Sequence, residues 1–473
     1  MPVNSFDDYY MSWKPDKSCL EKPYYQSLAR QLERDIMAGR LSDNTRLPPQ
    51  RELADFLDLN LSTVTRAYKL CELKGLLYGV TGSGTYVSPG SRVGDTFVDR
   101  GGSLIEMGMI KPFYETNCRV LEAARSVLGR RDSRRLFEYG DPLGTERQLS
   151  AARLWLEKRG APVEGDNLMI VAGAQNALSV ILLSLFRAGD KIAVDEYTYT
   201  NFRRLAGLLQ IQLVAVEADS RGMRPEALDA LCRHGGVKGI YLMPTCSNPT
   251  GLCMSRDRRM ELAETVRRYR LLVIEDDIYS FLAPADFQSF FSMAPKNTVH
   301  ICSLSKSLCA GLRVAYLAFP EQYRETLVSG MLSVNLKTVS LNAEIIAQLI
   351  ISGEADRIVE EKISLAHARN KIFRNYFPGG PEEVIPRFFH WVRLPGDMTS
   401  HEAELLALQK GIHILGSHRF AMGNRDPAHH VRLSIVSPRS EAELEEALGT
   451  LRELLGHTPL PSGVQGDRQA FYC

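Results

Sequence analysis

Four residues that suit phosphate and amine chemistry lie close together in the second half of this 473-residue chain. Lys306 ends the run Ser303-Leu304-Ser305-Lys306, and Arg313 follows seven residues later. Serine hydroxyls donate to phosphate oxygens, and an arginine adds a charge-assisted contact. A lysine placed beside them is partly desolvated, which lowers its pKa and favours imine chemistry. The spacing therefore predicts a site for a phosphorylated aldehyde, with Lys306 as the catalytic amine.

An acidic strand end supplies a partner for a protonated ring nitrogen. Residues 271–277 are expected to form a strand that ends in acids, and Tyr279 follows. A buried carboxylate is costly without a cationic partner, and a protonated pyridine nitrogen, which makes the ring an electron sink, is such a partner. Asp276 fits the spacing to Tyr279 best, with Asp277 as the competitor because the facing of the strand is open. With Lys306, this predicts pyridoxal 5′-phosphate (PLP) held as a Schiff base, the internal aldimine.

Two further segments fit the same cofactor. Asn248, in the run SNPTG, follows an apolar strand, so its amide can reach the phenolic oxygen of the cofactor. Ala174 and Gln175, in the run GAQN, follow another strand and open a helix, where free backbone N–H groups favour a phosphate. Either run alone is equally well explained as a turn or helix start. Their order along the chain, each after a strand, favours the cofactor site.

The residues around these motifs predict an α/β fold. From residue 105 onward, apolar strand-like runs alternate with helical stretches, which favours a largely parallel sheet. Residues 329–374 are expected to form one long, mostly helical crossover. The strands and helices after it predict a smaller α+β C-terminal subdomain, so the whole effector domain is expected to span 105–460.

The N-terminal residues 22–87 follow a separate pattern. Two short helices joined by a tight turn predict a helix-turn-helix, and a hairpin with its tip at residues 82–84 predicts a wing after it. The expected elements are helices 24–38, 50–57 and 63–74, the last capped by Asn60 or Ser62, and strands 76–78 and 85–87. Residues 88–104 are rich in Ser, Gly and charge and are expected to be a linker.

Bulk properties exclude several classes of protein. The chain is too long for one core, and 24% charged residues with a formal net charge of +1 are ordinary for a globular protein. No apolar run is long enough to span a membrane, and the N-terminus does not read as a signal peptide. Nine scattered cysteines without metal spacing indicate reduced thiols in a cytoplasm and no metal site.

The motifs carry a clear resemblance. Residues 105–455 resemble a fold-type I PLP-dependent aminotransferase through SNPTG, IEDDIY and SLSKSLCAGLRVAYLAFP. Residues 22–87 resemble the winged helix-turn-helix of GntR-type regulators through LPPQRELADFLDLNLSTVTRAY and GLLYGVTGSGTYV. The combination is similar to the MocR/GabR-type transcription regulators, which implies a double-stranded DNA partner, PLP as cofactor, an amine or amino-acid effector, and a homodimer.

The resemblance also implies roles for individual residues. Lys306 matches the Schiff-base lysine and Asp276 the acid on the pyridine nitrogen, while Arg432 matches the arginine that grips an effector or substrate carboxylate. The residues that match further cofactor contacts are Tyr279 and Asn248 at the phenolic oxygen, Tyr199 stacked on the ring, and Ala174, Gln175, Ser303, Ser305 and Arg313 at the phosphate. Tyr139 matches a tyrosine that reaches the phosphate in the partner subunit.

The DNA-binding hypothesis depends on where charges lie rather than on their number. Residues 1–90 hold eleven Lys or Arg and eleven Asp or Glu, so there is no net charge to favour DNA. The residues expected to contact DNA, around the second helix of the motif and the wing, are Arg46, Arg51, Ser62, Thr63, Thr65, Arg66, Gly82 and Gly84. A small interaction or dimerisation domain is the alternative interpretation of the same segment.

Two functions fit the whole pattern. The first is a PLP-dependent transcription regulator that senses an amine, an amino acid or PLP itself through Lys306. The second is an active aminotransferase, with Lys306 as general base and Arg432 as the carboxylate ligand. The motifs alone do not separate them, because cofactor binding and turnover use the same residues.

Overall fold

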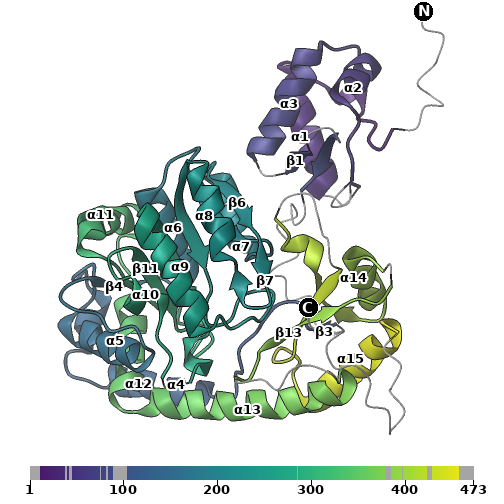
Figure 1. Cartoon of the computed structure of the whole chain (residues 1–473). Coiled ribbons are helices and arrows are strands. Elements are labelled where there is room, and N and C mark those ends of the chain that lie inside the picture. Colours follow the sequence, from purple (N-terminus) through teal and green to yellow (C-terminus); the bar gives the residue numbers. More distant parts are fainter. Residues whose placement is uncertain are drawn as a thin grey trace, which may run out of the picture. The chain divides into compact units, whose positions relative to one another are not determined.

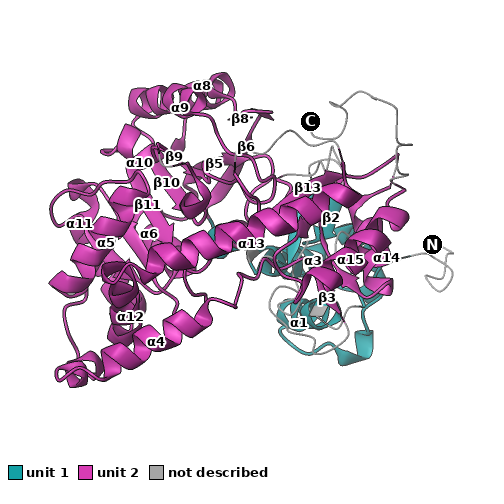
Figure 2. Ribbon diagram, turned by 90° about the horizontal axis from the view of Figure 1, so that it is seen from below, with its two compact units in different colours: residues 1–100, 204–210 teal, residues 101–203, 211–473 magenta. Residues whose placement is uncertain are grey.

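The computed structural model describes residues 11–37, 40–41, 45–74, 76–80, 84–88, 104–284, 286–378, 385–396, 398–422 and 429–456. The chain divides into two compact units, one of residues 1–100 with 204–210 and the other of residues 101–203 with 211–473 (Figure 2). Within these described ranges, no helix combines the length and apolar character needed to cross a membrane.

The first unit contains the expected helix-turn-helix (Figure 1). Its helices are α1 (Tyr24–Met37), α2 (Gln50–Leu57) and α3 (Leu61–Leu73). Leu28, Leu32 and Ile36 of α1 are fully buried, as their helical spacing predicts. Helix α3 begins two residues before the expected Thr63, because Asn60 keeps an extended backbone as the N-cap and Leu61 is already helical; the Asn60 side chain makes no capping hydrogen bond.

A two-stranded wing follows α3. Strands β1 (Leu77–Val80) and β2 (Gly84–Val87) pair antiparallel, with Tyr78 opposite Tyr86 and their rings stacked 5.6 Å apart. Arg46 forms an isolated antiparallel bridge with Tyr86, which brings the segment before α2 alongside the wing. The expected contact residue Gly82 and linker residues 89–103 lie outside the described residues.

The second unit is built on a seven-stranded sheet, which confirms the α/β fold class. The strand order is β4-β12-β11-β10-β9-β5-β6. Only β12 runs antiparallel to its neighbours in this sheet, so the core is largely parallel, as expected. The strands are β4 (Leu168–Val171), β5 (Lys191–Asp195), β6 (Gln212–Val216), β9 (Val237–Leu242), β10 (Leu272–Asp277), β11 (Thr298–Ser303) and β12 (Ala315–Ala318).

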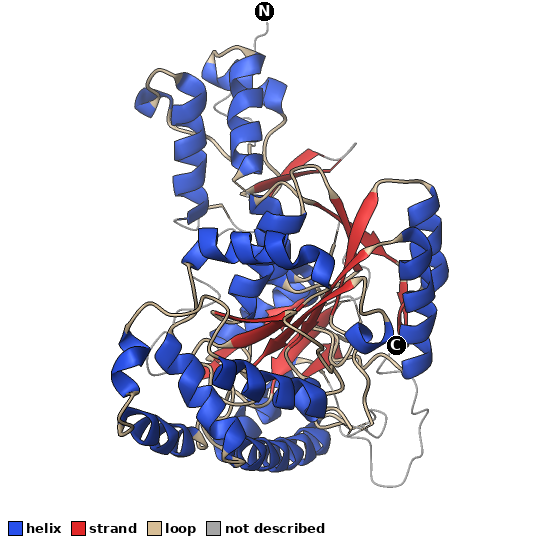
Figure 3. Ribbon diagram, turned by 90° about the vertical axis from the view of Figure 1, so that its left-hand side faces the viewer, coloured by secondary structure: helices blue, strands red, loops and turns tan. Residues whose placement is uncertain are grey.

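Helices surround this sheet (Figure 3). They are α4 (Asn117–Leu128), α5 (Glu146–Lys158), α6 (Ala174–Leu185), α7 (Thr200–Leu208), α8 (Pro225–Arg233), α9 (Arg256–Tyr269), α10 (Phe290–Met293), α11 (Arg324–Asn335), α12 (Ser340–Ile351) and α13 (Glu354–Tyr376). The expected long, mostly helical crossover 329–374 is confirmed. It is divided among α11, α12 and α13, because Leu336 (φ 62°) and Gly353 (φ 79°) take left-handed backbone angles that end a helix.

A smaller subdomain completes the second unit, and the long helix α13 extends from the part with the large sheet to this subdomain (Figure 1). Its antiparallel sheet has the order β13-β16-β15, formed by Phe389–Arg393, His430–Ser434 and Leu415–Gly416. Helices α14 (Ser400–Gln409) and α15 (Glu441–Leu454) accompany it. Strand β14 (Ile412–His413) pairs with β3 (Ile105–Glu106), so the start of the unit lies beside its C-terminal part.

Candidate cofactor and DNA-binding sites

The parallel strands deliver the predicted cofactor residues to one edge of the large sheet. Strands β4, β5, β9, β10 and β11 all point the same way, so their carboxyl ends meet at the same edge. Ala174, Tyr199 and Asn248 follow three of these strands within a few residues. Asp276 lies at the end of the fourth, and Lys306 directly after the fifth. The topology thus positions a site that the chain order alone scatters over more than 130 residues.

Lys306 meets the requirements for an amine nucleophile. Its Nζ atom points inward and donates to the backbone carbonyl of Ile110. Burial lowers its pKa from 10.5 to about 7, helped by the positive charges of Arg432, Lys362 and Arg313. A large share of the amine is therefore neutral near neutral pH, which is the form that attacks an aldehyde.

The Asp276 carboxylate is buried, and one of its two oxygen atoms has no hydrogen-bond partner. The Tyr241 hydroxyl donates to its Oδ2 atom at 2.8 Å, whereas its buried Oδ1 atom has no hydrogen-bond partner. Burial raises the pKa of Asp276 to about 7, so the carboxylate lacks a cation. An N–H of a protonated pyridine ring would satisfy Oδ1, since a buried unpaired acceptor is unfavourable.

Asp277 belongs to a different group of charges. Successive strand residues face opposite sides of a sheet, so Asp277 shares its side with Glu275 rather than with Asp276. Glu275 accepts from the backbone N–H groups of Phe290 and Phe291 at 2.7 and 2.8 Å, and its Oε2 atom lies 2.8 Å from His300 Nδ1. Burial alone would lower the pKa of His300, but the charge of Glu275 raises it well above its ordinary value. Both oxygens of Asp277 are also buried without a hydrogen-bond partner, so the facing of the strand is what favours Asp276 over Asp277 for the cofactor.

The start of α6 and the loop after β11 form a cradle for a phosphate. Gly173 precedes α6 with φ 85°, and a Cβ atom there would lie 2.7 Å from Arg313 Nη2, so only glycine fits. Arg313 Nη1 donates to Ser305 Oγ at 3.2 Å, and Ser305 N donates to Ser303 Oγ at 3.4 Å. Gln175 has a buried Oε1 atom without a partner. Arg313 thus lies beside the start of α6 and is bonded to Ser305, and free N–H groups of a helix start favour an anion.

Arg432, which is predicted to bind an effector or substrate carboxylate, lies in an enclosed environment. Arg432 is buried, its Nη1 atom donates to Asn248 Oδ1 at 2.5 Å, its Nη2 atom donates to Gly108 O, and its Nε atom has no partner. The guanidinium lies 4.8 Å from the Phe420 ring centroid. Burial lowers the pKa of Arg432 to about 10. A carboxylate ligand would complete this environment, because no carboxylate of the described residues contacts the group.

The two predicted tyrosines of the ring pocket are also enclosed. Tyr199 OH accepts from Asn201 Nδ2 at 3.0 Å, and burial, followed by the charge of Asp276, raises its pKa. Tyr279 is buried, and its ring packs 5.8 Å from the ring of Phe389. In contrast, Tyr139 lies in the loop after a short 3-10 helix, is 89% exposed, and makes none of these contacts within its own chain.

Sequence reasoning missed two residues of this site. Tyr241 supports Asp276, and its ring stacks on Phe202 with centroids 3.8 Å apart. Lys362 of α13 is fully buried, and its Nζ atom donates to the backbone carbonyls of Lys306 and Leu308 at 3.2 and 2.9 Å. A tyrosine inside an apolar strand was a usable signal, whereas Lys362 looks like an ordinary surface lysine in the sequence.

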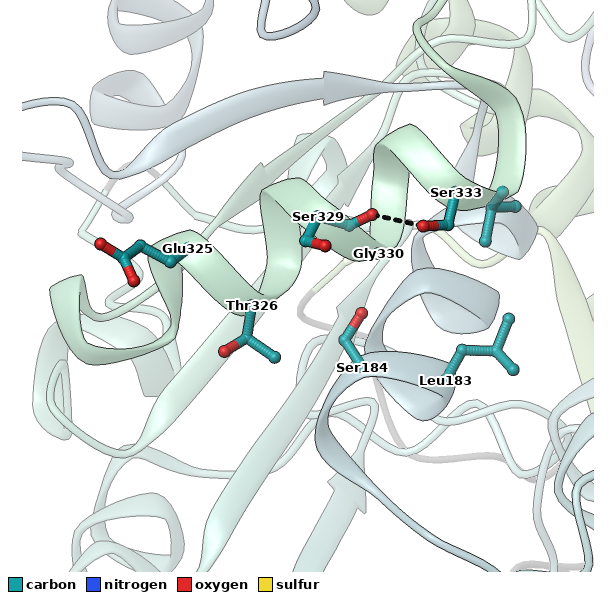
Figure 4. Close-up of a pocket in the computed structure, with 8 residues that line it drawn as sticks. Leu183, Ser184, Glu325, Thr326, Ser329, Gly330 and Ser333 are labelled. Atoms are coloured by element: carbon teal, nitrogen blue, oxygen red, sulfur yellow. Dashed lines mark hydrogen bonds between the residues drawn. The ribbon is translucent and has the colours of Figure 1, made fainter.

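A pocket elsewhere in the unit has different properties. Figure 4 shows it between α6 and α11, where Ser333 Oγ donates to Ser329 O at 2.8 Å. A Cβ atom on Gly330 would lie 1.8 Å from Ser184 Oγ, so the two helices touch there. Ser184 is near the opposite end of α6 from Ala174, about 15 Å along the helix axis. This pocket is therefore separate from the phosphate cradle.

These observations show that the site suits PLP. Asp276 Oδ1, the Gly173 cradle and the neutral Lys306 amine match the pyridine nitrogen, the phosphate and the aldehyde in turn. When bound, PLP supplies an electrophilic carbon and an electron-withdrawing ring. The chain's own contribution is to orient that ring, neutralise its phosphate and offer one amine.

In the first unit, most of the described residues proposed to contact DNA are exposed. Exposed among them are Arg46, Arg51, Ser62, Thr65, Arg66 and Gly84, and Thr63 is half-buried. Arg66 stacks over the Tyr25 ring at 4.0 Å, which holds its guanidinium at the surface. A Cβ atom on Gly84 would lie 3.1 Å from Arg46 Nε, so Arg46 runs along the start of the wing. Their roles in DNA binding remain a prediction.

Taken together, the fold and site define a protein that joins a winged helix-turn-helix to a PLP-dependent, fold-type I aminotransferase-like domain. The family described as aminotransferase class I and II matches residues 110–451, and the family of bacterial regulatory proteins of the gntR type matches residues 24–87. The chain belongs to the aminotransferase class I and II family and carries a GntR-type DNA-binding domain, the combination found in MocR/GabR-type regulators.

Several known proteins are similar to this chain. The chain is 39% identical to the uncharacterised HTH-type transcriptional regulator YdeF of Bacillus subtilis over 461 residues, covering 96% of this chain and 99% of the relative. It is 31% identical over 291 residues to PtsJ of Salmonella typhimurium, named a vitamin B6 salvage pathway transcriptional repressor, covering 61% and 65%. A kynurenine aminotransferase of Pyrococcus horikoshii, solved with PMP, superposes with a TM-score of 0.69 at 23% identity, covering 76% and 92%, and shows the likeness of fold.

Proposed function

We propose that this protein is a PLP-dependent transcription regulator that binds double-stranded DNA and responds to an amine or amino acid at the Lys306 site. The observation that carries the proposal is one chain holding both a GntR-type domain and a pocket that suits PLP. A regulator with this design acts where it meets its operator, in the cytoplasm. The division into a DNA-binding domain at 22–87, a linker at 88–104 and an effector domain at 105–460 is part of this proposal.

The effector site of the proposal is the space beside Arg432. An α-carboxylate would pair with the guanidinium, whose Nε atom has no partner, while the effector's amine meets the cofactor at Lys306. Binding energy that differs between two arrangements of the chain is what couples such an effector to DNA affinity. No complete catalytic cycle is needed for this coupling.

We also propose that the protein works as a homodimer with shared sites. Phe137 and Tyr139 are 71% and 89% exposed, and Val339 is 60% exposed. A Cβ atom on Gly140 would lie 3.2 Å from Lys337 Nζ, so the two loops that carry these apolar side chains are neighbours. Large apolar side chains gathered on a surface favour an interface. Tyr139 would then reach the cofactor phosphate of the second copy.

One experiment tests the regulatory function. A gel-retardation assay measures binding to the promoter fragment of the gene that encodes this protein. It compares the full PLP-loaded chain, the Lys306→Ala variant and the PLP-free chain, each with and without a panel of amino acids and amines. A change in retardation that needs Lys306 and an amine supports the proposal. Retardation that is the same in all three forms, with every effector, contradicts it. A change on adding PLP alone would make the cofactor itself the signal.

An active aminotransferase is the second candidate, favoured by the enclosed Arg432 and the neutral Lys306 amine. The same purified protein is incubated with amino acids and 2-oxoglutarate. Many product molecules per chain would support the enzyme, whereas at most one change of the cofactor spectrum per chain would support the regulator.

A further inference from the structure

Three possible metal ligands meet in the small subdomain, away from the cofactor residues in the sequence. His401 and Glu404 are three residues apart on α14, so they share one face of that helix. His418 lies in the 3-10 helix Ser417–Arg419. One ligand atom from each of the three residues lies within 4.8 Å of the other two. No CxxC or similar spacing reveals this group in the sequence.

The three side chains make no hydrogen bond to one another among the contacts of the described residues, although Glu404 is held by Arg419 and Gly416. Glu404 is buried, and its Oε2 atom lies 3.9 Å from His418 Nε2. That distance is too long for a hydrogen bond. Two ligands of a tetrahedral zinc ion lie about 3.4 Å apart, so the two side chains would close by about 0.5 Å on binding. His401 has a buried Nδ1 atom without a hydrogen-bond partner, and its ring meets the His418 ring edge-on with centroids 5.5 Å apart.

A neighbouring hydroxyl orients one of the imidazoles. Ser400 Oγ lies 2.9 Å from His418 Nδ1, which leaves Nε2 as the ring nitrogen on the Glu404 side. Metal-bound histidines are usually held in this way through the nitrogen that does not bind the metal. We propose that His401, Glu404 and His418 bind one divalent transition-metal ion, and we take zinc as the test ion because zinc is bound by two imidazoles and one carboxylate in known sites. Three protein ligands leave one coordination position open.

The surroundings of Glu404 set the expected strength of this site. Arg419 donates to both carboxylate oxygens at 2.7 and 2.8 Å, and the Gly416 backbone N–H donates to Oε1. These bonds fix the carboxylate and leave capacity on Oε2, since a carboxylate offers about four lone-pair positions. The arginine charge opposes a cation, so we expect affinity in the micromolar range rather than that of a structural zinc site.

An ion here would act on the effector side of the pocket. Strand β15 lies next to the site and pairs with β16 at Leu415 and Arg432. Just after His418, Phe420 O accepts from Thr198 N at 3.0 Å, in the loop that leads to Tyr199. Zinc would therefore hold in place the segment that connects the effector arginine with the residue stacked on the cofactor ring. This inference is independent of the DNA-binding proposal.

The test uses the full PLP-loaded protein, stripped of metal with a chelator and titrated with zinc against a colorimetric zinc indicator. His401→Ala and His418→Ala remove one ligand each. His234→Ala is the matched control, because His234 is exposed and only contacts Ala230 O. Glu404 is left intact, since its carboxylate also holds Gly416 and Arg419. Circular dichroism and the cofactor absorbance check that every variant is folded.

We expect one zinc ion per chain, with affinity at least about tenfold weaker in His401→Ala and His418→Ala and unchanged in His234→Ala. Zinc should also slow hydrogen exchange in residues 415–422 of the wild-type protein and of His234→Ala. It should have no such effect in His401→Ala or His418→Ala. Two results would overturn the proposal. One is equal zinc affinity in all four proteins, and the other is the absence of saturable binding by the wild type at zinc concentrations up to about 100 μM.

Discussion

The ionisation of Lys306 gives the sharpest test of the cofactor site. An amine with the ordinary pKa of 10.5 is about 0.1% neutral at pH 7.5, whereas one with a pKa of about 7 is about three-quarters neutral. The PLP-free protein should therefore capture PLP several hundred times faster than an ordinary lysine would allow. Because the amine is protonated below its pKa, capture should rise with pH up to about 7 and then level off.

Lys362 offers a way to change that ionisation without touching Lys306. Its ammonium group is buried against the Lys306 and Leu308 carbonyls and adds positive charge near the amine. Burial lowers the pKa of Lys362 itself to about 8, so it carries most of its charge near pH 7. At an effective dielectric constant of about 20, a unit charge at a separation of roughly 10 to 20 Å contributes about 0.8 to 1.7 kcal/mol, or up to about one pH unit. Lys362→Met should thus raise the midpoint of the capture profile by up to about one pH unit, since a nearby cation no longer disfavours the protonated amine.

The assay follows the absorbance of covalently attached PLP after mixing with PLP-free protein between pH 6 and pH 10. Lys371→Met is the control, because Lys371 is an exposed lysine of the same helix. The titration of free PLP is common to all three proteins and cancels in the comparison. The reasoning is refuted if the wild-type rate keeps rising tenfold per pH unit up to pH 10. It is also refuted if Lys362→Met and Lys371→Met give the same profile.

Three further predictions concern the remaining sites. Asp276→Asn should weaken PLP binding at least about tenfold more than Asp277→Asn, because only Asp276 has a free oxygen on the cofactor side; equilibrium dialysis of PLP measures this, and the reverse order would reassign the pair. Arg51→Ala should weaken DNA binding and lower the slope of log affinity against log salt by about one, and an unchanged slope would remove Arg51 from the interface. Tyr139→Ala should weaken PLP without dissociating the dimer, whereas Val339→Glu should give monomers in light scattering; monomeric wild-type protein would contradict the shared site.

Much of the fold was predictable because it rests on periodic burial. Leu28, Leu32 and Ile36 repeat every four residues, and the alternation of strands and helices after residue 105 implies a parallel sheet. The failures lie at single backbone angles. Nothing in the apolar pattern announces that Leu336 takes φ 62° and ends α11, or that α3 begins at Leu61 rather than Thr63.

The cofactor site was predictable to the extent that its residues follow strands in a fixed order. Strand alternation then separates Asp276 from Asp277, which the sequence could not do. Lys362 was not predictable, since its neighbours in α13 are as polar as those of a surface helix and only the tertiary fold buries it. The group of His401, Glu404 and His418 was not predicted for a similar reason, because its last two members are 14 positions apart in the sequence and only the fold brings them together.

Helix α13 links the two ends of the proposed sensor. Lys362 anchors the helix to the loop that carries Lys306, and two turns later Arg369 Nη1 donates to the carbonyls of Ile435 and Pro438 at 3.2 and 3.0 Å, just after the strand that carries Arg432. Lys362 and Arg369 are both buried and donate to backbone carbonyls. Breaking either set of hydrogen bonds would leave a buried donor unpaired, which is unfavourable. We propose that α13 couples Arg432 to Lys306, because its two anchors hold the segments that carry these residues. This connection is what a sensor requires, because an effector shifts an equilibrium only through contacts that differ between two states.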